Sequence, residues 1–184
     1  MNKSINYRKD HRTTEQFEKD IRCRTNKERF LIELFIKECE YHSRLIRIEN
    51  NGVDNSGQFM QKSNCNADYS YTHDGKVNLL EVKCSPVSHK CTFKVYNLQQ
   101  YIKQEASILL FYGVGKIDKD PSKIDYKNTR WAIIVPEKIQ QMLDEHEPYK
   151  EYLFGNKICI KIVQAEYDRY FQSCKLESAH VHIN

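Results

Sequence analysis

The chain has 184 residues, 40% of them hydrophobic, which is enough for one sizeable core and favours a single domain spanning residues 1–184. A net charge of +4 gives a mild preference for polyanionic partners and excludes a strongly basic tail. The odd number of seven cysteines predicts neither a disulfide framework nor a zinc knuckle. No stretch is apolar for the roughly 18 residues of a membrane span, and residues 1–16 lack the apolar core of a signal peptide, so we expect a cytoplasmic (intracellular) protein without membrane contact.

Two helices are predicted in the N-terminal part, over residues 12–24 and 25–42. Apolar residues recur at three- and four-residue intervals in both segments, as on the buried face of an amphipathic helix. Thr13 or Thr14 is positioned to cap the first helix and Thr25 or Asn26 the second, because short polar side chains accept hydrogen bonds from the free N–H groups of a first turn.

A strand, a long loop and a hairpin are predicted next. Residues 44–49 alternate apolar side chains with arginines, as in a strand with one face in water. Residues 50–66 are polar, contain two glycines and have no periodicity, which predicts a loop longer than most connections within a domain. Residues 67–73 and 76–86 fit the two arms of an antiparallel hairpin, joined by an Asp-Gly turn.

The remaining elements alternate between strands and helices. In chain order we expect a strand at 92–96, a helix at 97–106 capped by Asn97, strands at 107–115 and 130–135, a helix at 136–147 and a strand at 157–163. Pro136 fits the first turn of its helix, where no backbone N–H is needed. Together these elements predict an α/β fold with a central mixed β-sheet flanked by helices.

A glutamate and a lysine stand two positions apart in the second arm of the hairpin, in the stretch "VNLLEVKCSP" (residues 77–86). Side chains alternate along a strand, so Glu81 and Lys83 share one face, and Asp68 lies on the preceding arm. Two carboxylates suit Mg²⁺, and a lysine beside them can orient a metal-bound water or stabilise negative charge on a phosphate. We expect Glu81 and Lys83 to face solvent at the mouth of the sheet.

The spacing of "NAD" (66–68) and "EVK" (81–83), between a helix-strand unit and a further strand, helix and strand, resembles the PD-(D/E)XK nuclease superfamily. The resemblance covers about residues 26–115, looks most like Holliday-junction resolvases and restriction-type nucleases, and leaves 116–184 as a C-terminal α/β extension. It implies a restriction-endonuclease-like core and a Mg²⁺-dependent nuclease, with Mn²⁺ as an alternative ion. The Q-x-x-x-Y motif of the exonuclease branch has no match in residues 97–107, which favours an endonuclease.

The resemblance also implies roles for individual residues. Asp68 and Glu81 would bind the metal together with the carbonyl of Val82, and Lys83 would serve the attacking water. Glu28, on the helix before them, matches a glutamate that often assists in this superfamily. The competing interpretation of Glu28 is an exposed first-turn glutamate that interacts favourably with the helix dipole.

Nucleic acid is the partner that the resemblance implies, with DNA favoured over RNA, and a homodimer is compatible with it. Six side chains are candidate contacts to phosphates or to the attacking water: Arg44, Arg47, Lys62, Lys90, Lys94 and Gln100. The loop at 50–66 leads into Asp68, so we expect it to close over the bound nucleic acid, and the alternative that stays open is an inert surface insertion. The alternative from another functional class is a nucleic-acid-binding module of the same fold without catalytic activity.

Overall fold

The computed structural model describes residues 13–41, 47–51, 66–73, 75–115, 124, 128–152 and 156–175. The helices are α1 (Thr14–Tyr41), α2 (Val95–Lys103), α3 (Pro136–Glu145) and α4 (Tyr167–Tyr170), with a 3₁₀ turn at Gln164–Glu166. The strands are β1 (Arg47–Asn50), β2 (Tyr69–His73), β3 (Lys76–Ser85), β4 (Lys90–Lys94), β5 (Ser107–Tyr112), β6 (Arg130–Ile134), β7 (Tyr149–Glu151), β8 (Lys157–Val163) and β9 (Cys174–Lys175).

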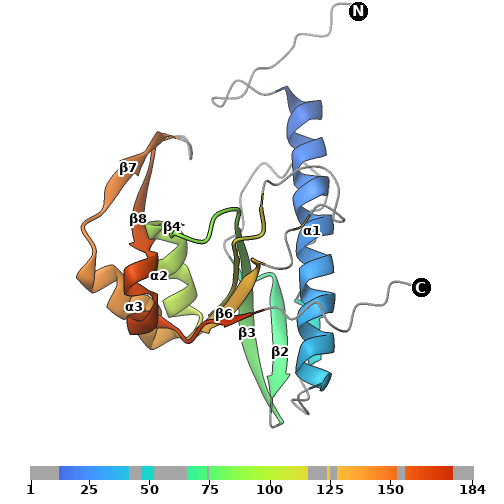
Figure 1. Ribbon diagram of the computed structural model, residues 1–184. Helices are drawn as coiled ribbons and strands as arrows, with labels where there is room; N and C mark the ends of the chain where they lie inside the picture. Colours follow the sequence, from blue (N-terminus) through green and yellow to red (C-terminus); the bar gives the residue numbers. More distant parts are fainter. Residues whose placement is uncertain are drawn as a thin grey trace, which may run out of the picture.

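Six strands form a central sheet in the order β1-β2-β3-β5-β6-β9. The β3–β5 pair is parallel and its other neighbouring pairs are antiparallel, so the sheet is mixed. Three strands form a second, antiparallel sheet in the order β4-β8-β7. Figure 1 shows α1 along one side of the central sheet, with α2, α3 and the second sheet on the other side. The predicted α/β class, a central mixed sheet flanked by helices, is confirmed.

The N-terminal segment is one continuous helix of 28 residues, so the prediction of two helices is wrong. No glycine or proline separates the two predicted segments, and Thr25 and Asn26 cost a helix interior only a fraction of a kcal/mol, about 0.7 or less. The helix begins with the predicted Thr13 cap: its hydroxyl accepts the N–H of Gln16 at 3.1 Å, while the Gln16 side chain accepts the N–H of Thr13 at 2.9 Å.

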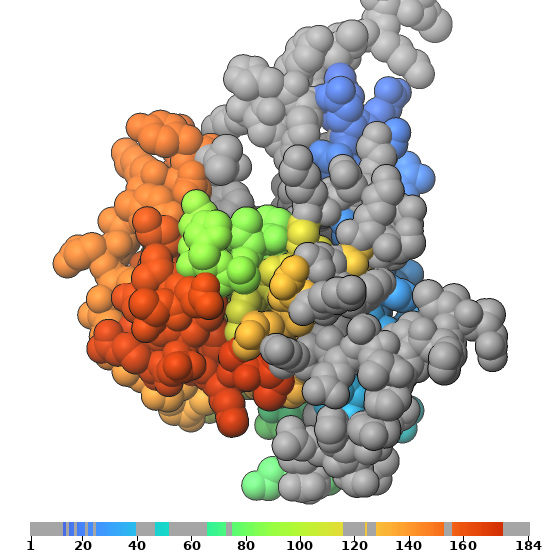
Figure 2. Space-filling view, viewed as in Figure 1, coloured from blue at the N-terminus to red at the C-terminus, as the bar shows by residue number. Residues whose placement is uncertain are grey.

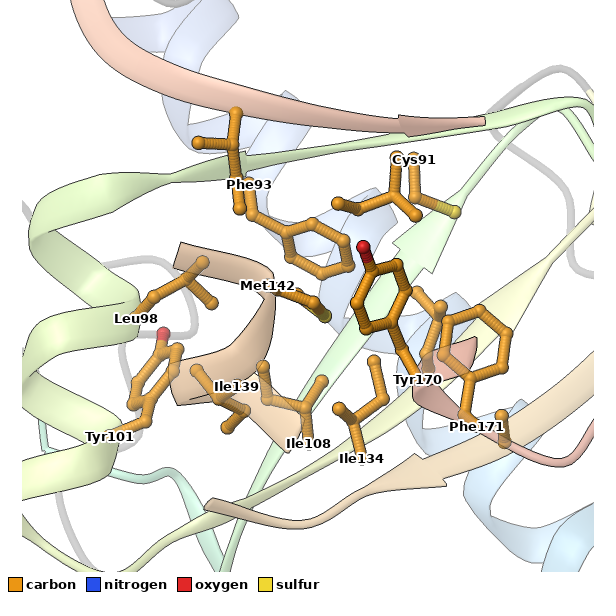
Figure 3. Close-up of a cluster of buried hydrophobic side chains, with 14 of the residues drawn as sticks. Cys91, Phe93, Leu98, Tyr101, Ile108, Ile134, Ile139, Met142, Tyr170 and Phe171 are labelled. Carbon is orange, nitrogen blue, oxygen red and sulfur yellow. The ribbon is translucent and has the colours of Figure 1, made fainter. Parts of the chain in front are cut away.

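Two hydrophobic clusters hold these layers together, one on each face of the central sheet. Under α1, the apolar side chains of the helix, including Leu31 and Phe35, pack against those of β3, β5 and β6. On the other face, residues of α2, α3, α4 and the second sheet pack against β5 and β6 (Figure 3). Every residue of β5 is buried, as its uninterrupted apolar stretch predicts for a strand covered on both faces.

The hairpin of β2 and β3 and the helix α3 match their predictions. Gly75 has a φ of +74°, which a tight turn between paired strands requires and glycine adopts without strain. Pro136 stands in the first turn of α3. The predicted cap at Asn97 is wrong, because α2 begins two residues earlier, directly after β4, and Lys94 occupies the capping position.

Several predicted features lie outside the described residues. They are Arg44, Lys62 and the part of the predicted long loop at 52–65. No helix in the described part of the chain is long and apolar enough to cross a membrane.

Candidate functional site

The site lies on the half of β3 where its antiparallel neighbour has ended. β2 pairs with β3 from His73–Lys76 to Tyr69–Leu80. Beyond that pair, residues 81–85 continue alongside β5, and the described part of β2 offers them no further partner. On that edge the described residues give Glu81 and Lys83 no strand partner, and Asp68 immediately precedes the last paired residue of β2. We call residues 81–85 the open half of β3.

The alternation of β3 sends its charged and apolar side chains to opposite faces. Leu80 and Val82 belong to the cluster under α1. Glu81 is opposite Ile108 in the register, and Ile108 belongs to the cluster on the α2 side. Glu81 and Lys83 therefore point towards α2.

Glu81 is buried, with 4% of its surface exposed, which corrects the expectation that it faces solvent. Its carboxylate oxygen Oε1 contacts the Nζ of Lys83, whose side chain is 36% exposed. Glu81 is buried because it lies beside β5, all of whose residues are buried, and faces Tyr101 of α2, which is 2% exposed. A buried carboxylate needs a charged or hydrogen-bonding partner, and Lys83 supplies one.

The environment keeps Lys83 positively charged. Burial by itself lowers the pKa of the ammonium, but the Glu81 carboxylate beside it, followed by Tyr101, outweighs this effect and holds the pKa above its usual range. Lys83 therefore acts as a hydrogen-bond donor and positive charge at neutral pH, and a role as general base is disfavoured.

Tyr101 of α2 completes the Glu81–Lys83 pair and was not identified from the sequence. Its side chain is 2% exposed and shares hydrogen bonds with both partners, and its ring centroid lies 5.7 Å from the Nζ of Lys83. Burial, with the charge of Glu81 as a further cause, raises the pKa of the Tyr101 hydroxyl above its usual value. The hydroxyl therefore stays protonated and can donate to the carboxylate.

The backbone around Asp68 is held from two sides. The N–H of Ala67 donates to Oε1 of Gln104 at 3.1 Å, and the carbonyl of Asp68 accepts the N–H of Asn51 at 2.9 Å. Gln104 follows Tyr101 by three residues at the C-terminal end of α2, so that end of one helix supports both the Asp68 segment and the Glu81–Lys83 pair. A Tyr-x-x-Gln spacing in the helix after β4 is the signal that could have identified Tyr101.

Glu28 approaches the site from α1. The hydroxyl of Tyr69 donates to its Oε1 at 3.0 Å. Burial raises the pKa of Glu28 to about 7; Lys83 and the Tyr69 hydrogen bond lower it, while the charges of Asp68 and Glu81 raise it further. The three carboxyl groups therefore interact electrostatically, and Glu28 is partly protonated at neutral pH. This environment differs from the exposed first-turn glutamate of the competing interpretation.

The other predicted nucleic-acid contacts are dispersed. Arg47 is exposed and pairs with Glu49 at 2.7 Å on the edge strand β1. Lys90 and Lys94 stand at the two ends of β4, and Gln100 lies on α2 beside Tyr101. Of these, Gln100 is adjacent in sequence to a residue that contacts Glu81.

The donor set fits a magnesium ion held by few protein ligands. No group of three or more His, Cys, Asp or Glu side chains in the described residues is placed to hold one metal ion. Mg²⁺ is commonly bound through one or two carboxylates and keeps several waters. Asp68, Glu81 and the carbonyl of Val82 are therefore a sufficient set in number and chemistry.

Comparison with known proteins gives no relative from which to transfer a function. No model of a known protein family matches the chain, and no curated protein matches it.

Proposed function

We propose that the chain is a Mg²⁺-dependent nuclease that hydrolyses phosphodiester bonds, with DNA as its substrate and an endonucleolytic mode of cleavage. The observation that carries the proposal is the position of Glu81 and Lys83 on the open half of β3, with Asp68 where β2 ends. A carboxylate paired with a lysine on one strand, with a second carboxylate on the neighbouring arm of the hairpin, supports a site for a divalent ion and a phosphate.

In this proposal Asp68, Glu81 and the Val82 carbonyl hold the metal. A bound Mg²⁺ would polarise the phosphate and lower the pKa of a bound water. Lys83 would donate hydrogen bonds to the attacking water and to a phosphate oxygen, so that the water is aligned and the negative charge that develops on the phosphate oxygens is stabilised. Its raised pKa supports this role as a donor.

Two further groups support these residues. Tyr101 contacts both the carboxylate of Glu81 and the ammonium of Lys83 and so fixes their relative position. Glu28, whose pKa of about 7 allows both protonation states near neutral pH, would support a bound ion as an outer carboxylate.

The experiment is a cleavage assay of the purified protein on linear, branched and single-stranded DNA and on RNA, with Mg²⁺, with Mn²⁺ and with EDTA. We expect cleavage of at least one DNA substrate that requires the metal and is also obtained with Mn²⁺. Binding of nucleic acid without cleavage under all conditions would instead favour the non-catalytic binding module. The absence of both would contradict the proposal.

A further inference from the structure

The second sheet has one face in the hydrophobic core and one face directed away from it. Phe93 of β4 and Ile160 and Ile162 of β8 are buried on the inner face. Because side chains alternate, the residues between them share the outer face. Figure 1 shows the β7–β8 hairpin of this sheet extending away from the central sheet and from α1, and the same hairpin projects from the surface in Figure 2.

The outer face carries four lysines: Lys90, Lys94, Lys157 and Lys161. The register places Lys161 directly opposite Thr92, so that Lys90 and Lys94 are its two diagonal neighbours, about 7–8 Å away between backbones. Lys90, Lys157 and Lys161 are exposed. Like charges this close repel one another, so the arrangement is unfavourable unless a negative partner meets it.

The described strands of the second sheet place one carboxylate on the outer face. Glu151 is the acidic residue on the outer face, opposite Lys157, and its Oε2 accepts the Tyr149 hydroxyl at 3.1 Å. The described part of the chain provides no ion pair for Lys90, Lys157 or Lys161. The outer face therefore has four positive charges and one negative charge.

The neighbouring helices have the opposite charge. Segments 136–147 and 164–170 contain six acidic residues and two basic ones: Glu137, Asp144, Glu145, Glu147, Glu166 and Asp168 against Lys138 and Arg169. Charges placed for solubility alone are interspersed. Here they are segregated between the outer face of the second sheet and the α3–α4 side, which would orient the protein on a polyanion.

We infer that the outer face of the second sheet is a phosphate-binding surface that holds the backbone of a DNA duplex, in addition to the site on β3; this inference rests on the proposed function. Lys90 and Lys94, like Lys157 and Lys161, are four residues apart on one strand, which corresponds to about 13 Å. That spacing matches the major groove of DNA, about 12 Å wide, so each pair can meet phosphates on its two sides. The contacts carry affinity and no sequence information.

The test measures binding of a fluorescein-labelled DNA duplex by anisotropy, in EDTA so that no cleavage intervenes. The variant Lys90→Gln/Lys161→Gln is compared with Lys37→Gln/Lys76→Gln, which removes the same charge from exposed positions on α1 and at the start of β3, outside the second sheet. We expect the first variant to bind at least about ten-fold more weakly than wild type at moderate salt, and its slope of log affinity against log salt to be smaller by about two. The second variant should bind like wild type.

Each other outcome overturns the inference, and the outcomes separate it from the proposed function. Equal weakening of both variants, or of neither, would show that the outer face has no particular role, while DNA binding and the site on β3 would stand. Failure of wild type to bind any DNA would contradict the proposed function as well. Lysine-dependent binding of polyglutamate in place of DNA would assign the surface to an acidic protein. Thermal unfolding of both variants checks that they are folded.

Discussion

The two halves of β3 differ in their strand partners, and the candidate site residues of this strand lie in only one of the two halves. Residues 76–80 pair with β2 on one side. Residues 81–85 lie along β5 while the described part of β2 has ended, and this half holds Glu81 and Lys83. A buried charge is costly unless it is paired, and here Glu81 and Lys83 pair with each other on the part of β3 that lies beyond the last β2 partner.

The comparison predicts that changes in the open half remove activity, whereas changes in the paired half do not. The largest effect is expected for Glu81→Gln, which keeps the volume of the side chain but loses its charge. Cleavage should fall by about a hundred- to a thousand-fold, because the metal loses a ligand and Lys83 loses its anionic partner. Asn78→Ala, in the paired half, serves as the control in the same single-turnover assay, and a Glu81→Gln rate equal to wild type would contradict the assignment.

Asp68 lies at the boundary between the halves, and Asp68→Asn tests whether it is a metal ligand. We expect Mg²⁺ to bind at least about ten-fold more weakly, as measured by calorimetric titration, since loss of even an indirect support commonly costs that much. Binding of DNA should be unchanged or tighter, because one carboxylate no longer repels the phosphates. An unchanged magnesium constant would show that Asp68 is not a ligand.

Tyr101 lies on α2 and contacts the two charged residues of the open half of β3, so its hydroxyl can be tested separately from that strand. Tyr101→Phe keeps the buried ring and removes the hydroxyl that contacts Glu81 and Lys83. We expect cleavage about ten-fold slower at saturating DNA with little change in KM, since the groups are misplaced and substrate contacts remain. Tyr96→Phe on the exposed side of the same helix is the matched control. Equal rates for the two variants would leave Tyr101 a core residue only.

Glu28 should give the smallest effect on cleavage, a few-fold at most, and a clear effect on stability. Its pKa is about 7 in the folded protein, against 4.5 for a glutamate free in water, so folding favours the neutral carboxyl. Stability from this group is therefore complete below pH 4.5 and is lost as the pH rises through 7, by up to about 3 kcal/mol.

Glu28→Gln removes this dependence. Urea unfolding should show the variant more stable than wild type at pH 8 and similar to it at pH 4.5. The control is Glu33→Gln, an exposed position on the same helix. A difference between Glu28→Gln and wild type that does not change with pH would contradict the raised pKa.

The fold class and several elements were predictable because local signals and tertiary packing agree. The hairpin has its glycine turn and alternating arms, and α3 has its proline start. Sequence patterns gave a wrong element boundary where the same residues fit both a helix cap and a helix interior. Thr25 and Asn26 resemble caps but sit in a helix interior, because no glycine or proline interrupts the helix there and both residues are tolerated within it.

The second sheet and the supports of the site required three-dimensional information. β7 has three residues and β9 has two, too few for any periodicity to be visible. The sequence indicates that residues 157–163 form a strand but not that they pair with β4, 63 or more residues earlier in the chain. Tyr101 and Gln104 reach the site through the packing of α2, and the burial of Glu81 depends on β5 and α2 closing over it.

The central claim is that the open half of β3 is the catalytic half, and one measurement on two lysines of that strand tests it most directly. Lys83→Ala in the open half and Lys76→Ala at the paired end remove the same charge from the same strand. The rate of single-turnover cleavage is measured with saturating Mg²⁺ on the best DNA substrate. The account predicts that Lys76→Ala cleaves like wild type and that Lys83→Ala is at least about a hundred-fold slower while remaining folded and DNA-bound. Cleavage by folded Lys83→Ala at the wild-type rate would contradict it.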